Sequence, residues 1–219
     1  MKNRLDNELE ELNNNIVNMG TLCENIITCA MNCFNANNKE ELLIVNELEN
    51  KIKEYENSIE SKCLKLLLHQ QPVAKDLRLI SSTLKMITDL MRIGHQSYEI
   101  SLLSNNSNIL YDEIIILSKE TIKLLSNSID AYVKKDIDLA INTIKQDDIV
   151  DNLFINVRHV IIEKIKLDNN NAKIALDMFM IAKYLERIAD HAVSLSELVI
   201  YLINGTLKGE IYDSNTRGW

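Results

Sequence analysis

Apolar residues recur at three- and four-residue steps along most of this chain, which is the spacing of one face of an α-helix. Leu9, Leu12, Ile16 and Met19 illustrate the step near the start. The pattern predicts six long helices. The expected stretches are about Leu5–Phe34, a second carrying apolar positions 45–66, a third carrying positions 77–98, Leu110–Val133, Asp136–Lys166 and Ala172–Asn204.

Polar segments separate these stretches. The breaks are expected at Asn35–Asn38, His69–Pro72, Ser104–Asn108 and Leu167–Asn171. Pro72 ends the second helix because a residue before proline avoids the helical region. Asp136 is an expected N-cap and Gly205 an expected C-cap, since these residue types satisfy free backbone groups or adopt a left-handed turn there.

Short connections between long helices make neighbours antiparallel. The prediction is therefore an all-α fold of two tandem three-helix up-down bundles that pack side by side. The first bundle spans residues 1–104 and the second spans 109–205, with the polar linker between them. Residues 206–219 are expected to form a loosely structured C-terminal tail.

A five-residue pattern occurs twice and indicates an internal duplication. The C-terminal copy reads Glu186-Arg187-Ile188-Ala189-Asp190, and the earlier copy reads Met91-Arg92-Ile93-Gly94-His95. The later copy places two carboxylates one helical turn apart, whereas the earlier copy has neither. The two halves are therefore expected to differ in chemistry while sharing one fold.

Four carboxylates flank the apolar stripes of the fifth and sixth predicted helices. Asp147 and Asp151 are four residues apart on one, and Glu186 and Asp190 are four apart on the other. Like charges at this spacing repel, and a multivalent cation would remove the repulsion while using the oxygens as hard ligands. The pattern predicts a metal site in the second half, with a solvated acidic face as the alternative.

The equivalent positions of the first half lack this set of four carboxylates. Glu49 aligns with Asp147, but Lys53, Met91 and His95 replace the other three carboxylates. Glu49 and Lys53 make a favourable i,i+4 pair instead. The first half is therefore expected to pack and pair at this place, although metal binding through Glu49 and His95 stays open.

Composition narrows the classes of function. The 219 residues carry a formal net charge of −8, which disfavours nucleic acid as a partner, because phosphate binding needs a clustered basic face. The start of the chain has no apolar core typical of a signal peptide, and no apolar run approaches the ~18 residues of a membrane helix. A soluble, cytoplasmic protein without membrane insertion is expected.

Neither the cysteines nor the histidines indicate catalysis. Cys23, Cys29, Cys33 and Cys63 fit apolar positions and are expected as reduced, buried thiols. Di-iron carboxylate bundles need Glu-x-x-His on their helices. The residues three before the four histidines are Leu66, Arg92, Asn156 and Ile188. Since no phosphate loop or nucleophile motif is present either, a protein that is not an enzyme is expected.

Two stretches resemble the PhoU family of phosphate-uptake regulators. Residues 71–78, Gln-Pro-Val-Ala-Lys-Asp-Leu-Arg, followed by Arg92-Ile93-Gly94, resemble the first repeat of that family. Residues 136–140, then Asp147 and Asp151, then residues 185–190 resemble the second repeat. The resemblance covers about residues 5–205. It implies the same two-bundle fold, commonly as a homodimer.

The resemblance also implies a function. PhoU proteins restrain high-affinity phosphate uptake and signal to the phosphate-responsive two-component system. The implied partners are the ATPase subunit of the phosphate ABC transporter and a sensor histidine kinase. The family's acidic motifs bind iron, zinc or other divalent metals such as manganese in some members, and Asp147, Asp151, Glu186 and Asp190 match them.

Three other interpretations fit the residues. The chain would be a metal-free interaction scaffold with solvated carboxylates, a metal-dependent enzyme on a helical bundle, or an accessory protein of a different transporter. Metal content separates the first from the PhoU-like interpretation. An activity screen with iron or manganese addresses the second, and neighbouring genes decide the third.

Overall fold

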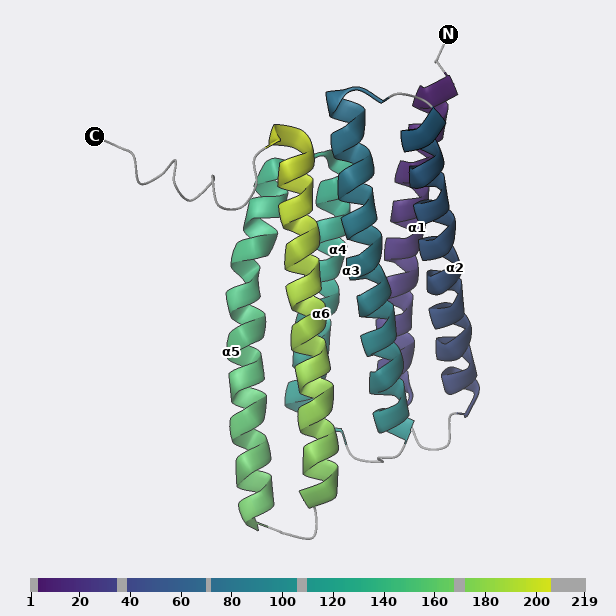
Figure 1. Ribbon diagram of the computed structural model, residues 1–219. Helices are drawn as coiled ribbons and strands as arrows, with labels where there is room; N and C mark the ends of the chain where they lie inside the picture. Colours follow the sequence, from purple (N-terminus) through teal and green to yellow (C-terminus); the bar gives the residue numbers. More distant parts are fainter. Residues whose placement is uncertain (1–3, 35–38, 70–71, 106–109, 168–171, 206–219) are drawn as a thin grey trace, which may run out of the picture.

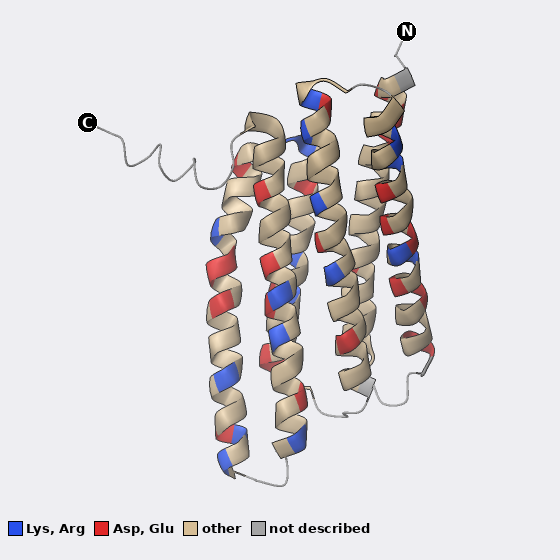
Figure 2. Cartoon of the chain, in the orientation of Figure 1, with Lys and Arg blue, Asp and Glu red and all other residues tan. Residues whose placement is uncertain are grey.

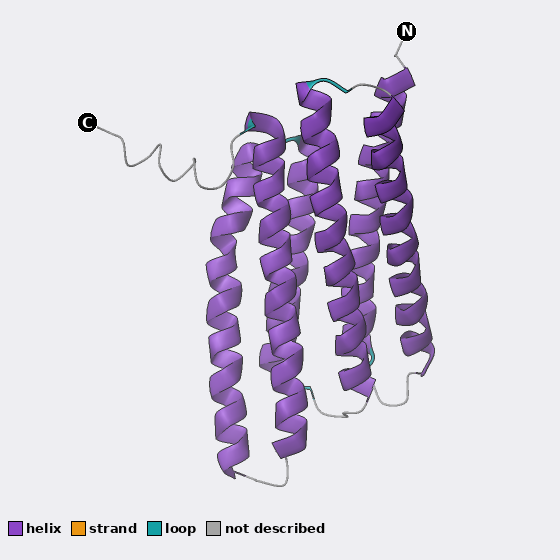
Figure 3. Cartoon of the chain, viewed as in Figure 1, coloured by secondary structure: helices purple, strands orange, loops and turns teal. Residues whose placement is uncertain are grey.

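The computed structural model describes residues 4–34, 39–69, 72–105, 110–167 and 172–205, and all the regular structure in these ranges is helical (Figure 3). The six predicted helices are confirmed. Their bounds are α1 Arg4–Asn32, α2 Lys39–His69, α3 Ala74–Asn105, α4 Asp112–Lys134, α5 Ile137–Leu167 and α6 Ala172–Asn204. Each helix buries one apolar stripe and exposes the opposite face, which is why the amphipathic spacing predicted these helices.

The helices form two groups of three that lie side by side (Figure 1). Helices α1, α2 and α3 pack on one another, as do α4, α5 and α6. The groups meet where α3 packs along α6 and α1 packs against α4. With 31 and 33 residues, α5 and α6 are longer than the 23-residue α4, and their connected ends project beyond the other helices.

Both predicted caps of the second half are present. The Leu139 N–H donates to Asp136 Oδ1 over 2.9 Å, so Asp136 satisfies a free donor at the start of α5. Gly205 has φ of +75° and its N–H donates to Tyr201 O over 2.8 Å, which ends α6. The predicted break at Asn35–Asn38 and the predicted tail at 206–219 lie outside the described residues.

Two helix ends differ from the sequence prediction. Helix α1 ends at Asn32, and Cys33 and Phe34 form a turn instead of extending the helix. Helix α3 continues through Asn105, beyond the expected end of the first bundle at residue 104. Ser104 Oγ donates to Ile100 O over 2.7 Å, so this polar residue is accommodated inside the last turn.

Close backbone approach depends on glycine at two places. A Cβ at Gly20 of α1 would lie 2.6 Å from Ile129 Cδ1 of α4, across the junction of the two groups. A Cβ at Gly94 of α3 would lie 2.9 Å from Ile52 Cδ1 of α2. Since real carbon atoms do not approach so closely, these glycines let the helices pack at their present spacing.

Hydrogen bonds also connect the two groups. Asp89 of α3 accepts from Ser194 Oγ of α6 over 2.8 Å, and its other oxygen lies 2.9 Å from His191 Nδ1. Tyr132 of α4 donates to Asn13 Oδ1 of α1 over 2.5 Å. Because these polar side chains are paired where the helices meet, the two three-helix groups are held in one register.

The cysteines behave largely as the sequence predicts. All four are free thiols; Cys23, Cys33 and Cys63 are buried, while Cys29 is only partly buried. Among the described helices, none is long and apolar enough to cross a membrane.

Candidate metal centre

The four predicted ligands lie on two helices that pack against each other. Asp147 and Asp151 are one turn apart on α5, and Glu186 and Asp190 are one turn apart on α6. The buried residues beside them, Val150 on α5 and the stripe of α6, fix which way these turns face. Asp147 and Glu186 are half-buried, whereas Asp151 and Asp190 are exposed. Acidic positions of the two helices lie at similar heights in Figure 2.

The negative charges of this cluster act on one another. Burial, followed by the charges of Asp151, Asp190 and Glu186, raises the pKa of Asp147 to about 6. Burial and the charge of Glu186 also raise the pKa of Asp190, which nearby Lys183 and His191 partly oppose. A raised carboxyl pKa means that the ionised form is destabilised, and a bound cation would relieve this.

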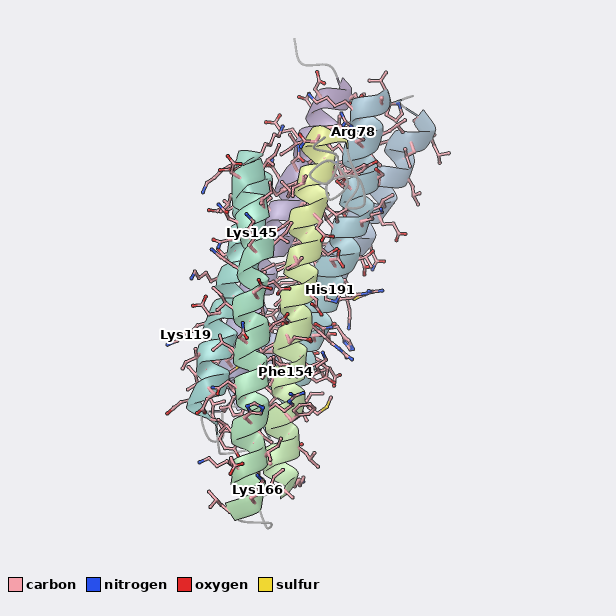
Figure 4. The ribbon with its side chains drawn as sticks, turned by 90° about the vertical axis from the view of Figure 1, so that its left-hand side faces the viewer. Arg78, Lys119, Lys145, Phe154, Lys166 and His191 are labelled. Atoms are coloured by element: carbon pink, nitrogen blue, oxygen red, sulfur yellow. The ribbon has the colours of Figure 1, made fainter. Side chains whose placement is uncertain are left out.

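A lysine partly neutralises the cluster. Lys183 Nζ lies 2.5 Å from Glu186 Oε2, three residues along α6. The same ammonium lies 5.3 Å from the ring centroid of Phe154 on α5, which is labelled in Figure 4. A cation over an aromatic face gains further attraction. Lys183 is therefore held across α5 and α6 at the edge of the four carboxylates.

The carboxylates are neighbours but not a preassembled ligand set. Within the described part of the chain, no three His, Cys, Asp or Glu side chains are placed so that they could hold a metal ion as they stand. The chemistry of the donors fits a hard divalent cation, because all four are carboxylates and ionised forms are already disfavoured by repulsion. Release of Glu186 from Lys183 and rotation of the side chains would be needed to bind one.

At the aligned positions of the first half, basic side chains neutralise the one carboxylate that is present. Glu49 is buried on α2 and its Oε1 lies 2.9 Å from Lys53 Nζ and 3.2 Å from His95 Nδ1 of α3. The predicted Glu49–Lys53 pair is thus present. The fourth aligned position, Met91, packs against the apolar core. Glu49, Lys53 and His95, which align with three members of the acidic cluster, therefore form one carboxylate with two basic partners.

Sequence reasoning missed two features next to the site. The Lys183–Glu186 pair was visible as an i,i+3 spacing of opposite charges. The bond of His191 to Asp89 had no such signal, because the partners are 102 residues apart. Figure 4 shows His191 beside the seam of α6 and α3, so the residue that follows Asp190 connects the second half to the first.

A family model for the PhoU domain matches this sequence twice, over residues 16–103 and 114–199. The chain belongs to the PhoU family. The two matches coincide with the two groups of three helices, so each group is one PhoU repeat. The residue patterns near Pro72 and Glu186 that resembled the two repeats fall inside the two matches.

Individual PhoU proteins are similar along nearly the whole chain. The phosphate-specific transport system accessory protein PhoU homolog of Clostridium acetobutylicum is 30% identical over 206 residues, 91% of this chain and 94% of that protein. PhoU homolog 1 of Thermotoga maritima is 31% identical over 206 residues, 91% of this chain and 89% of that protein. The crystal structure of PhoU from Pseudomonas aeruginosa superposes with a TM-score of 0.87 at 29% identity, covering 93% of this chain and all of that one.

Proposed function

We propose that this chain is a cytoplasmic accessory protein of phosphate-specific transport, and that it restrains phosphate uptake when phosphate is plentiful. The observation that carries the proposal is full-length similarity to proteins of that name, in both repeats and in fold. An accessory role also suits a chain in which two of the four clustered carboxylates, Asp151 and Asp190, are exposed at the surface of α5 and α6. The role is regulatory and involves no catalysis by this chain.

The proposed partners are the ATPase subunit of the phosphate ABC transporter and a sensor histidine kinase, with a homodimer as the functional unit. An exposed apolar stripe along the C-terminal half of α5 and the first third of α6 supports docking. Ile155 and Ile162 lie two turns apart on α5, and Leu176 and Met180 lie one turn apart on α6, all more than a third exposed. Apolar surface of this kind marks sites of protein contact.

The proposed metal centre lies next to that stripe. Asp151 is one turn before Ile155 on α5, and Lys183 is one turn after Met180 on α6. Binding of iron, zinc or manganese by Asp147, Asp151, Glu186 and Asp190 would tie α5 to α6 by ionic contacts. We propose that the metal thereby stiffens the docking surface, while the first repeat contributes packing.

The proposed role is tested by phosphate uptake. In phosphate-rich medium, cells that lack their own copy of this gene should take up labelled phosphate several-fold faster than cells that carry it. An Ile155→Glu, Ile162→Glu variant should fail to restore slow uptake and to co-purify with the ATPase subunit. The matched control is Ile44→Glu, which changes an apolar residue of similar exposed fraction on α2, in the first repeat. Equal uptake with and without the gene would contradict the role.

A metal-free scaffold is the second candidate, and one observation favours it. The Lys183–Glu186 ion pair already neutralises part of the cluster, and the ligands are not preassembled. In that case the same surfaces dock without a cation. Chelation would then leave both co-purification and uptake control unchanged, whereas the metal-dependent proposal expects chelation to weaken co-purification.

A further inference from the structure

Two cysteines and a glutamate lie close together in the first repeat, where α1 ends and α2 begins. Cys29 is in the last turn of α1, and Cys33 directly follows that helix, four residues later. Glu41 is in the first turn of α2, which packs against α1. Burial, followed by the charge of Glu41, raises the pKa of both thiols, that of Cys33 to about 11. The carboxylate is therefore near enough to act on both sulfur atoms.

One carboxylate oxygen of Glu41 is buried without a donor. Glu41 Oε2 is shielded from solvent and accepts no hydrogen bond from the described part of the chain. An acidic residue in the first turn of a helix is common because the helix dipole favours it, but its buried oxygens normally accept hydrogen bonds. Burying a charged oxygen without a donor or a cation is unfavourable. A cation shared with the two thiols would satisfy it.

The end of α1 also favours positive charge. The last carbonyl groups of a helix form the negative end of its dipole. The last turn of α1 contains no Lys, Arg or His that could interact with them. The Cys29 carbonyl accepts from the Cys33 N–H over 3.2 Å and from the Cys33 thiol over 3.4 Å, so this sulfur already lies against the end of the helix.

The types of donor select the metal. Thiolate sulfur favours zinc and copper(I) over hard cations such as Mn²⁺, whereas a carboxylate oxygen is a poor ligand for copper(I). Zn²⁺ accepts Cys and Glu ligands in one site, and three protein ligands leave its fourth position for water. Cys29 is only partly buried, which gives an ion a path from solvent. The combination therefore suits Zn²⁺.

We propose that Cys29, Cys33 and Glu41 bind Zn²⁺ between the end of α1 and the start of α2. As they stand the three side chains are not a ligand set, and binding turns the Cys33 thiol away from the Cys29 carbonyl. Each cysteine releases its proton to water when the ion binds, so affinity rises with pH. Because both thiols hold their protons strongly, the site fills from added Zn²⁺ and is mostly empty in protein purified at neutral pH.

This site is separate from the carboxylate cluster of α5 and α6, and a titration with Cd²⁺ tests it alone. Cadmium bound by thiolates absorbs in the ultraviolet, whereas cadmium bound by carboxylates alone does not. The titration uses the full chain with Asp147→Ala and Glu186→Ala, at mildly alkaline pH with a phosphine reductant. The absorption band should saturate at one Cd²⁺ per chain, and a large excess of Zn²⁺ should remove it. No band, or a band that Zn²⁺ leaves unchanged, would overturn the proposal.

Three variants of the same chain identify the ligands. Cys29→Ser and Cys33→Ser should each weaken Zn²⁺ binding by about tenfold or more, because each removes one of only three protein ligands. Glu41→Gln should weaken it several-fold while the cadmium band persists.

The matched control is Cys63→Ala, which removes another buried free thiol. Cys63 lies roughly 33 Å from Glu41 along α2, since a helix rises about 1.5 Å per residue. Its replacement should change neither the cadmium band nor Zn²⁺ affinity. Unchanged Zn²⁺ affinity in any of the three ligand variants, or an equal loss in the Cys63 variant, would overturn the three-ligand site.

Discussion

Lys183 Nζ lies 2.5 Å from Glu186 Oε2 and 5.3 Å from the ring of Phe154, so one ammonium is held between α6 and α5. It lies at the place where two carboxylates from each helix face one another. In the absence of a metal ion, this lysine supplies the positive charge that the cluster lacks. A cation and Lys183 therefore compete for Glu186.

Replacing Lys183 by Met should separate these two roles. Without its ammonium, the metal-free protein should lose about 1 kcal/mol of stability, because the pair is partly buried and stronger than a fully exposed one. Affinity for Mn²⁺ should rise several-fold, since Glu186 no longer has to be released. Urea unfolding with chelator and calorimetric titration measure the two effects.

The control for that prediction is Lys166→Met, which removes an i,i+3 pair with Glu163 three turns beyond Asp151 on α5. It should lower stability by a few tenths of a kcal/mol and leave Mn²⁺ affinity unchanged. Weaker metal binding by the Lys183 variant would show that the lysine supports the site instead of competing for it.

The raised pKa of Asp147, about 6, predicts how metal-free stability varies with pH. Between pH about 4 and 6 the folded chain binds more protons at this group than the unfolded chain does, so stability falls as pH rises through that window. Asp147→Asn should therefore stabilise the metal-free protein at pH 7.5 by about 1 kcal/mol, after discounting for solvent screening of this partly exposed group. The gain should vanish near pH 4.

Thermal unfolding with chelator at both pH values checks the prediction, and Asp148→Asn is the neighbouring control. Asp148 is exposed and its charge is the weakest contributor to the raised pKa of Asp147, so its removal should change little. A stabilisation by Asp147→Asn that is the same at pH 4 and pH 7.5 would mean that ionisation of the partly buried Asp147 is not its cause.

The first repeat should accept the acidic cluster of the second. Lys53→Asp, Met91→Glu and His95→Asp together place four carboxylates at the aligned positions around Glu49. Because buried Glu49 loses both basic partners, the metal-free variant should be destabilised by about 3 kcal/mol. Mn²⁺ should restore this stability and bind with about one additional ion per chain. No extra bound metal in a folded variant would show that the repeats differ in more than these side chains.

Gly20 should resist substitution although it lies inside a helix. Alanine is the better helix former by about 1 kcal/mol, but its Cβ would press on Ile129 Cδ1 across the α1–α4 contact. Gly20→Ala is therefore expected to lower stability by about 1 kcal/mol net. Adding Ile129→Ala removes all three side-chain atoms that the new Cβ would approach, so Gly20→Ala should no longer destabilise in that background, which a double-mutant cycle measures. Additive effects of the two changes would contradict the close contact.

The six helices followed from sequence because the 3.6-residue apolar repeat is continuous in each of them, and Asp136 and Gly205 cap as their residue types predict. The pairing of Glu49 with Lys53 also followed, since both lie on one helix. The sequence did not predict which helices contact one another. The repeat shows which face of α3 or α6 is buried but not which helix covers it, so the bond between Asp89 and His191 needed the fold.

The candidate site shows the same limit. Spacing placed Asp147 with Asp151 and Glu186 with Asp190, and the packing of α5 on α6 brings the two pairs together. Which partner each carboxylate takes depends on side-chain positions that spacing leaves open. The i,i+3 spacing of Lys183 and Glu186 makes their ion pair possible, but the contact of the same ammonium with Phe154 of α5 needed the fold.

The most direct test of this account is the metal content of the full chain purified without chelator, measured by plasma mass spectrometry. Wild-type protein and a Glu49→Gln control should carry near-stoichiometric iron, zinc or manganese. The Asp147→Ala, Glu186→Ala variant should carry almost none. Equal metal in the wild type and the double variant would contradict a metal centre in the second repeat and place the metal elsewhere. No metal in either would also contradict it and leave the metal-free scaffold as the account of this protein.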